Sequence, residues 1–173
     1  MQNDLDFVQY FWAARAWDGD DYGNWSGNFT FNVTSSVSCE IGLANISFGT
    51  IQPGTPVNAT KNYAGASDAT HYNVTSSSNL PVNITHKGTN MTSAEGNVIR
   101  VYNTSWKSAL TATDSTMNYG NKIAMQEAYD TTNKVATALP VGDAAYLRYW
   151  LNTPTEQAIG LYSGNYTVLC AAA

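Results

Sequence analysis

Charged side chains are scarce in this sequence. Only 12% of the 173 residues are Asp, Glu, Lys or Arg, and the formal net charge is −5. The eight Lys and Arg residues are scattered singly and form no basic stripe. Nucleic acids and anionic membrane surfaces are bound by clustered positive charge, because their phosphate groups must be neutralised. The composition therefore predicts that neither is a partner of this chain.

Long apolar runs are also missing. No stretch approaches the roughly 20 consecutive apolar residues that cross a bilayer, so no membrane span is predicted. The amino-terminal residues lack the basic and apolar regions of a signal peptide. If the protein is secreted, we therefore expect this sequence to be the processed form.

Potential metal ligands are few. The chain has two cysteines, Cys39 and Cys170, and two histidines, His71 and His86. The cysteine spacing matches no metal-binding motif, so no metal and no other cofactor is predicted. Two possibilities stay open for the cysteine pair: a disulfide, which an oxidising compartment favours, or two buried free thiols.

Motifs for catalysis are absent as well. None of the 13 Asp and Glu residues stands in a recognisable catalytic motif, and neither histidine accompanies a Gly-x-Ser-x-Gly sequence. Asp18, Asp20 and Asp21 resemble half of a calcium loop, but no glutamate closes it, so a solvated acidic turn is the simpler interpretation. The chain is predicted not to be an enzyme.

Asn, Ser and Thr, by contrast, are abundant and form many Asn-x-Ser/Thr sequons. The sequence contains ten, whereas chance pairing of these residues predicts only about 3.5. The excess predicts an extracellular or cell-surface protein that carries N-linked glycans. The alternative is that a polar composition produces the motif passively. The ten candidate glycosylation sites are Asn24, Asn28, Asn32, Asn45, Asn58, Asn73, Asn83, Asn90, Asn103 and Asn165.

Three of these sequons follow one another at a stride of four within residues 24–34. In a strand, alternate side chains point to opposite faces, so Asn28 and Asn32 share one face and Phe29 and Phe31 share the other. A helix would also bring the asparagines together, but apolar residues at period two contradict it. Residues 28–34 are predicted to form a strand with an outward sequon face.

The rest of the chain shows the same pattern of short strands and turns. Residues 97–106 alternate cleanly, and residues 144–154 and 158–170 read as two final strands around Pro154. Turn signals recur at intervals of roughly 8–12 residues, which is typical of a β-sandwich or barrel. We therefore predict an all-β chain, an immunoglobulin-like or jelly-roll-like β-sandwich.

Two stretches carry a resemblance to a known family. "CEIGLANISFGTIQPGT" (39–55) resembles the first strand of sandwich-type extracellular fibre subunits, and "TPTEQAIGLYSGNYTVLC" (153–170) resembles the hairpin that ends many secreted immunoglobulin-like domains. With the dense sequons, the chain resembles archaeal filament subunits of the thread and bundling-pilus type, which are related in architecture to the bacterial TasA/camelysin biofilm fibre proteins. The resemblance implies an incomplete sandwich that a neighbouring subunit's N-terminal strand completes.

The segment "LDFVQYFWAARAW" (5–17) is the candidate for that donor strand. Both of its faces are mostly apolar, which is typical of a strand that is covered on both sides. Two alternatives stay open: the chain's own first strand, or a short amphipathic helix. The prediction divides the chain into a donor strand (1–17), a flexible tether (18–27) and a single sandwich domain (28–173). The residues expected at the subunit interface are Leu5, Phe7, Val8, Tyr10, Phe11, Trp12, Ala13 and Ala14.

The function predicted from these observations is structural. The chain is expected to be a secreted, N-glycosylated subunit of an extracellular filament that polymerises with itself, head to tail, by donor-strand complementation, for adhesion or biofilm formation. The main alternative is a monomeric carbohydrate-binding or adhesin domain, in which the five Trp residues form a sugar-stacking platform instead of packing in the core. A glycosylated envelope lattice or viral coat component is a third possibility.

Overall fold

The computed structural model describes residues 9–42, 46–55, 58–59, 71–112 and 114–173. The chain divides into two compact units, Met1–Ser36 and Val37–Ala173. We call them the hairpin unit and the sandwich unit, and each is described by itself.

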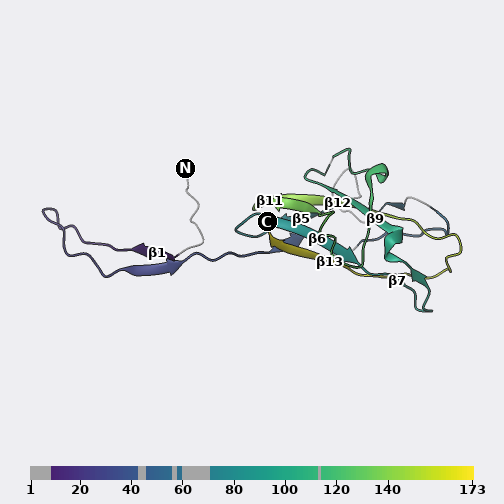
Figure 1. The fold of residues 1–173 in the computed structure, drawn as a ribbon, viewed down its shortest axis with the longest axis horizontal. Helices are drawn as coiled ribbons and strands as arrows, with labels where there is room; N and C mark the ends of the chain where they lie inside the picture. The colour runs from purple at the N-terminus through teal and green to yellow at the C-terminus, as the bar shows by residue number, and fades with distance from the viewer. Residues whose placement is uncertain (1–8, 43–45, 56–57, 60–70, 113) are drawn as a thin grey trace. The chain divides into compact units, whose positions relative to one another are not determined.

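The hairpin unit is built on two antiparallel strands, β1 (Gln9–Trp12) and β2 (Phe29–Asn32), drawn in purple and blue in Figure 1. Backbone hydrogen bonds continue beyond the strands: the N–H of Ser26 donates to the carbonyl of Ala14 at 2.7 Å, and the N–H of Gly23 donates to that of Ala16 at 2.9 Å. Residues 13–28 therefore extend the same hairpin toward its tip.

The larger sheet of the sandwich unit has six strands. Its main path runs β10 (Ile123–Ala124), β9 (Thr104–Ala109), β12 (Ala144–Leu151), β5 (His71–Ser76) and β3 (Cys39–Ile41), and β4 (Asn58–Ala59) also pairs with β12. All of these pairings are antiparallel. The central strand β12 is the longest, and its buried and half-buried residues alternate as expected for a strand between neighbours.

The second sheet has three antiparallel strands in the order β11 (Ala136–Leu139), β6 (Val82–Gly88) and β13 (Tyr166–Ala172). A small hairpin, β7 (Met91–Thr92) and β8 (Val98–Ile99), turns at Gly96, whose φ of 81° lies in the left-handed region that glycine tolerates. Short 3₁₀ turns at Val101–Asn103 and Tyr119–Asn121 complete the described elements.

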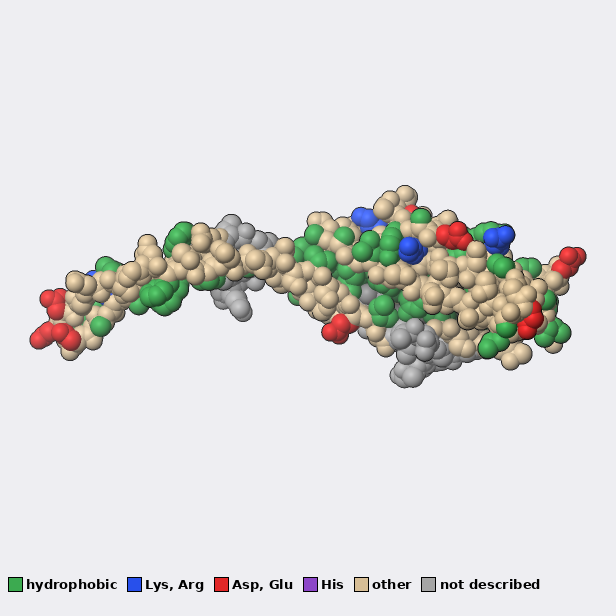
Figure 2. All heavy atoms as spheres, turned by 90° about the horizontal axis from the view of Figure 1, so that it is seen from below, with side chains coloured by type: hydrophobic (Ala, Val, Ile, Leu, Met, Phe, Trp, Pro, Cys, Tyr) green, Lys and Arg blue, Asp and Glu red, His purple; other side chains and the backbone are tan. Residues whose placement is uncertain are grey.

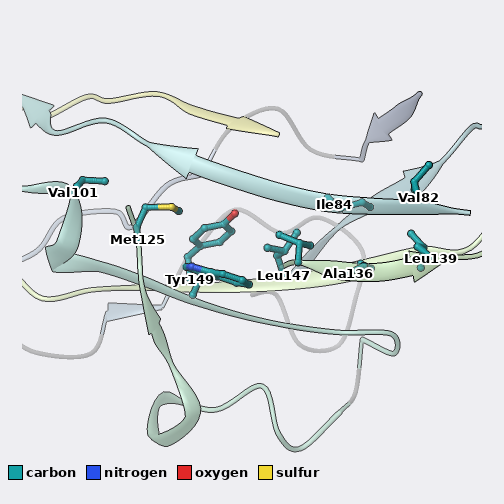
Figure 3. Close-up of a cluster of buried hydrophobic side chains, with 11 residues drawn as sticks. Val82, Ile84, Val101, Met125, Ala136, Leu139, Leu147 and Tyr149 are labelled. Atoms are coloured by element: carbon teal, nitrogen blue, oxygen red, sulfur yellow. The ribbon is translucent and has the colours of Figure 1, made fainter. Parts of the chain in front are cut away.

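The core lies between the two sheets. Figure 3 shows Val82 and Ile84 of β6 on one side and Leu147 and Tyr149 of β12 on the other. Trp106 from β9 is buried in the same cluster. Aromatic and branched residues on facing strands thus pack a sandwich core, and the predicted all-β sandwich is confirmed.

Several local predictions compare directly with the structure. The first of the two final strands is confirmed as β12, whereas the second, β13, begins only at Tyr166, so residues 158–165 lie outside it. Residues 97–106 are interrupted, because the 3₁₀ turn at Val101–Asn103 separates β8 from β9. The predicted domain boundary follows Gly27, whereas the compact units divide after Ser36. The expected tether, residues 18–27, lies in the tip and returning side of the hairpin, because its backbone bonds to residues 14–16.

Candidate functional site

Two edge strands of the sandwich unit, one from each sheet, are joined to each other. Among the described residues, β13 pairs only with β6, and β3 pairs only with β5, so each stands at the edge of its sheet. Cys39 of β3 and Cys170 of β13 form a disulfide that joins these two edges, with their Cα atoms 6.3 Å apart. An edge strand presents unpaired backbone N–H and C=O groups, which are a template for another strand.

A groove lies beside the start of β13. It encloses about 720 Å³ and is lined mainly by residues 46–51 and 157–166; of these, only Tyr166 belongs to a named strand, β13. Ile46, Phe48 and Tyr166 pack against the core here but stay only partly buried. A smaller hollow of about 230 Å³, between residues 37–41 and Val168, borders the rest of β13. β13 thus contributes Tyr166 to the larger hollow and Val168 and Cys170 to the smaller one.

No described residue in the lining of either hollow is Asp, Glu, Lys, Arg or His. Three tyrosines line the larger hollow, and burial raises the pKa of two of them, Tyr149 and Tyr166, above the ordinary value. The described lining suits an uncharged, largely apolar occupant.

The rim of the groove carries two strongly exposed aliphatic side chains. Ile159 is 94% exposed and Leu161 is 89% exposed. The segment is held locally, since the Tyr162 hydroxyl donates to the carbonyl of Ala158 and accepts from the Gln157 amide. In Figure 2, apolar side chains are seen at the surface of the molecule, and charged ones are sparse. Exposed aliphatic residues beside an apolar groove are typical of a surface that a partner covers.

The predicted donor residues are found in the hairpin unit where they are described. Tyr10 and Trp12 stack across the hairpin on Phe31 and Phe29, and Phe11 is exposed. Ala13 is half-buried, and the N–H of Ala14 donates to Ser26 Oγ. The other three predicted donor residues, Leu5, Phe7 and Val8, lie outside the described residues.

The ten sequon asparagines differ in their surroundings. The structure places Asn24, Asn28, Asn32 and Asn165 at exposed positions, and it leaves Asn83, Asn90 and Asn103 half-buried. Asn83 accepts the N–H of Ala138, and Asn90 accepts the N–H of Val101 at 2.8 Å. Asn58 lies in β4 and Asn73 in β5, whereas Asn45 lies outside the described residues.

The acidic turn at the hairpin tip is held by its own backbone. Asp18 Oδ1 accepts the N–H groups of Asp20 and Asp21 at 3.0 and 2.8 Å. These bonds stabilise the carboxylate and lower the pKa of Asp18. Over the described part of the chain, no group of three His, Cys, Asp or Glu residues could hold a metal ion.

His86 was not singled out by sequence reasoning, yet it is buried at the centre of the core. Its Nδ1 lies 3.1 Å from the Tyr149 hydroxyl, and its ring meets Trp106 edge to face. Burial lowers the pKa of His86 to about 4. Its Nε2 has no hydrogen-bond partner among the described residues. The period-two pattern of β6 places residue 86 on the same face as Val82 and Ile84, and this spacing could have predicted that His86 is buried.

The five tryptophans do not form one platform. Trp106 and Trp150 are buried in the sandwich unit, whereas Trp12, Trp17 and Trp25 are exposed in the hairpin unit. Core packing therefore accounts for two of the five.

Comparison of the chain with family models, with curated proteins and with solved structures found no match. No helix within the described ranges is long and apolar enough to cross a membrane.

Proposed function

We propose that this chain is the structural subunit of an extracellular filament, in which the N-terminal hairpin unit of one copy occupies the groove of the next. The observation that carries the proposal is a groove whose described lining is uncharged and which reaches the edge strand β13 at its first residue, Tyr166. A strand added there completes the smaller sheet by β-augmentation, because main-chain hydrogen bonds supply affinity and apolar side chains fill the groove. Assembly, with no bond chemistry, is the function.

The hairpin unit supplies a suitable donor. β1 and β2 contain no charged residue, and the aromatic side chains of both strands are largely exposed. Covering the exposed ring surface of Trp12, Phe29 and Phe31, about 300 Å², contributes on the order of 7 kcal/mol before the entropic costs of association, at about 25 cal/mol per Å². Donor and acceptor surfaces differ, so the contact is head-to-tail and propagates instead of closing into a dimer.

The remaining features support an extracellular setting. A disulfide persists in an oxidising compartment, and it ties the first described strand of the sandwich unit to the last. The exposed sequons offer attachment points for N-linked glycans, which would shield sheet edges from random pairing. We extend the proposal to filaments of the archaeal thread and bundling-pilus type, with adhesion or biofilm formation as their role.

Electron microscopy and sedimentation of three variants test the proposal. The full chain should form filaments, and the chain without residues 1–36 should stay monomeric. A double substitution at the rim of the groove, Ile159→Glu with Leu161→Glu, should also abolish filaments while the secondary structure stays intact.

A matched control places the same charges on exposed apolar positions outside the groove, Leu110→Glu with Val141→Glu. This variant should assemble like the unchanged chain. Filaments formed by the chain that lacks residues 1–36, or equal loss in the control, contradict the proposal.

A carbohydrate-binding role is the second candidate, and the exposed Trp12, Trp17 and Trp25 favour it. Sugars stack on exposed indole rings, so binding would shift tryptophan fluorescence. Titration of the monomer with oligosaccharides, compared with a Trp17→Ala and Trp25→Ala variant, decides between the two functions. A saturable shift that the variant loses supports the binding role.

A further inference from the structure

The β1–β2 hairpin has two chemically different faces. Residues directly opposite one another in an antiparallel pair share a face. Tyr10 lies opposite Phe31 with ring centroids 5.3 Å apart, and Trp12 lies opposite Phe29 at 4.8 Å; both pairs are stacked. We call these four rings the aromatic face.

The other face carries the sequons. Gln9 lies opposite Asn32, and Phe11 lies opposite Thr30. Asn28 stands two residues before Thr30, and this spacing returns a side chain to the same face of a strand. Glycans on Asn28 and Asn32 would therefore leave the hairpin on the side opposite the rings. We call this the sequon face.

The aromatic rings also tie the two strands together. Tyr10 and Trp12 of β1 each stack on a ring of β2, so removing β1 by itself would break both stacks and the whole strand ladder. Donation of a single strand has to lose these contacts before it gains new ones. Donation of the hairpin as a unit keeps them.

We propose that the hairpin is donated whole: its aromatic face lies against the groove of the next copy, and its sequon face points to solvent. This inference rests on the function proposed above and adds which element is donated and which side is buried. It also assigns Asn28 and Asn32 as positions where glycans are compatible with the assembled filament.

A second copy of this chain is the occupant that the surfaces favour. Neither the aromatic face nor the described part of the groove lining carries a charged side chain, so contact between these residues buries no unpaired charge. Trp12, Phe29 and Phe31 are 51%, 50% and 43% exposed. At roughly 150–250 Å² for each aromatic side chain, this leaves about 300 Å² of ring surface for a partner to cover. The groove, at about 720 Å³, has the capacity for several rings.

A disulfide across the hairpin tests whether the strands must separate. Gln9 and Asn32 lie directly opposite each other on the sequon face, away from the rings. The variant Gln9→Cys with Asn32→Cys is produced without glycosylation and oxidised, and peptide mapping verifies both its new bond and Cys39–Cys170. The matched control is Gln9→Ser with Asn32→Ser.

We expect the locked variant to form filaments with a critical concentration within about twofold of that of the serine control, because the new bond joins residues that already pair and leaves the aromatic face unchanged. A tenfold change would correspond to about 1.4 kcal/mol. Filaments from the serine control but none from the locked variant would overturn whole-hairpin donation and leave the proposed function standing. Absence of filaments from the unchanged chain and from both variants would overturn the proposed function itself.

Neighbouring substitutions in the locked background test which face is buried. Phe31 and Thr30 are adjacent in β2 but lie on opposite faces. Phe31→Asp should raise the critical concentration at least about tenfold, because it places a charge in an uncharged groove, whereas Thr30→Asp should change it less than about twofold. The locked bond holds the strands together in both variants. The reverse order of effects contradicts the assigned face.

Discussion

Both units contain large aromatic residues, but the tryptophans are buried in the sandwich unit and at least half exposed in the hairpin unit. In the sandwich unit, Trp106 and Tyr149 are buried, because each strand is covered by a second sheet. In the hairpin unit, Trp12 and Phe29 are stacked on each other but remain half exposed. A two-stranded ribbon has no second layer, and an isolated hairpin is marginally stable in water. Hydrophobic sequence produces a core only where the topology supplies two layers.

Removal of a core aromatic residue should show the difference most strongly. Trp106→Ala is expected to lower the free energy of unfolding of the sandwich unit by about 3–5 kcal/mol, because it removes a fully buried ring and leaves a cavity. Urea unfolding followed by circular dichroism measures the effect. The matched change in the hairpin unit, Trp12→Ala, should alter that free energy by less than about 0.5 kcal/mol. Equal losses of unfolding free energy in Trp106→Ala and Trp12→Ala would contradict the view that only the sandwich unit has a buried core.

Loss of the disulfide should have the next-largest effect on the free energy of unfolding of the sandwich unit. Cys39→Ser with Cys170→Ser opens a loop of 131 residues and is expected to destabilise the sandwich unit by up to about 5 kcal/mol, the value of the chain-entropy model for this loop. The urea midpoint is the measurement, and reduction of the unchanged chain should reproduce it. A loss below about 1 kcal/mol would show that the loop is already constrained in the unfolded chain.

Acidification should weaken the sandwich unit through His86. Its pKa is about 4 in the folded chain, because burial disfavours the charged ring, and about 6.5 when unfolded. Between these values the unfolded chain binds a proton that the folded chain does not. The free energy of unfolding therefore falls as the pH drops from about 6.5 to 4, by about 3 kcal/mol in total.

Urea midpoints at pH 7, 5.5 and 4.5 measure this dependence. A His86→Phe variant should be less stable at pH 7, because the hydrogen bond between the Tyr149 hydroxyl and His86 Nδ1 is lost, but its midpoint should vary much less over this range. Asp130, which slightly favours protonation of His86, has a lowered pKa of its own and titrates below this range. An unchanged slope in His86→Phe would assign the dependence to other groups.

The smallest effect is expected in the hairpin unit. The Arg15 guanidinium lies 3.7 Å from the centre of the Tyr22 ring and 4.7 Å from that of Trp25. Arg15→Ala should cost about 0.5–1 kcal/mol locally, since such contacts are weak at exposed sites. The Gly23 and Ser26 amides should then exchange about 2–5 times faster, with no change at amides of β12. Arg15→Lys is the control, and it should retain part of the protection.

Local patterns were predictable from the sequence. The alternation in residues 28–34 places Phe29 and Phe31 on one face of β2, as the pairing with Tyr10 and Trp12 confirms. Strands β12 and β13 and the all-β class follow from similar signals. The disulfide, one of two possibilities open from the sequence, is confirmed.

The strands and side chains that come together in the fold were not predictable in the same way. Nothing in residues 28–34 indicates that their neighbour is β1 and not a strand of the sandwich unit, because strand pairing depends on contacts distant in sequence. The groove was missed for the same reason: residues 46–51 and 157–166 come together only in the folded chain. His86 likewise becomes a core residue only through its contacts with Tyr149 and Trp106.

The period of each strand and the faces of its side chains can be read from the amino-acid sequence, because they depend on neighbours a few residues apart, and the shortage of charge follows from the composition. The unpaired sheet edges, the position of the groove and the pairing of β1 with β2 arise only when the chain folds. Those features depend on which distant strands pair. The free energy of each pairing depends on packing against a second sheet, whose residues are far away in the sequence.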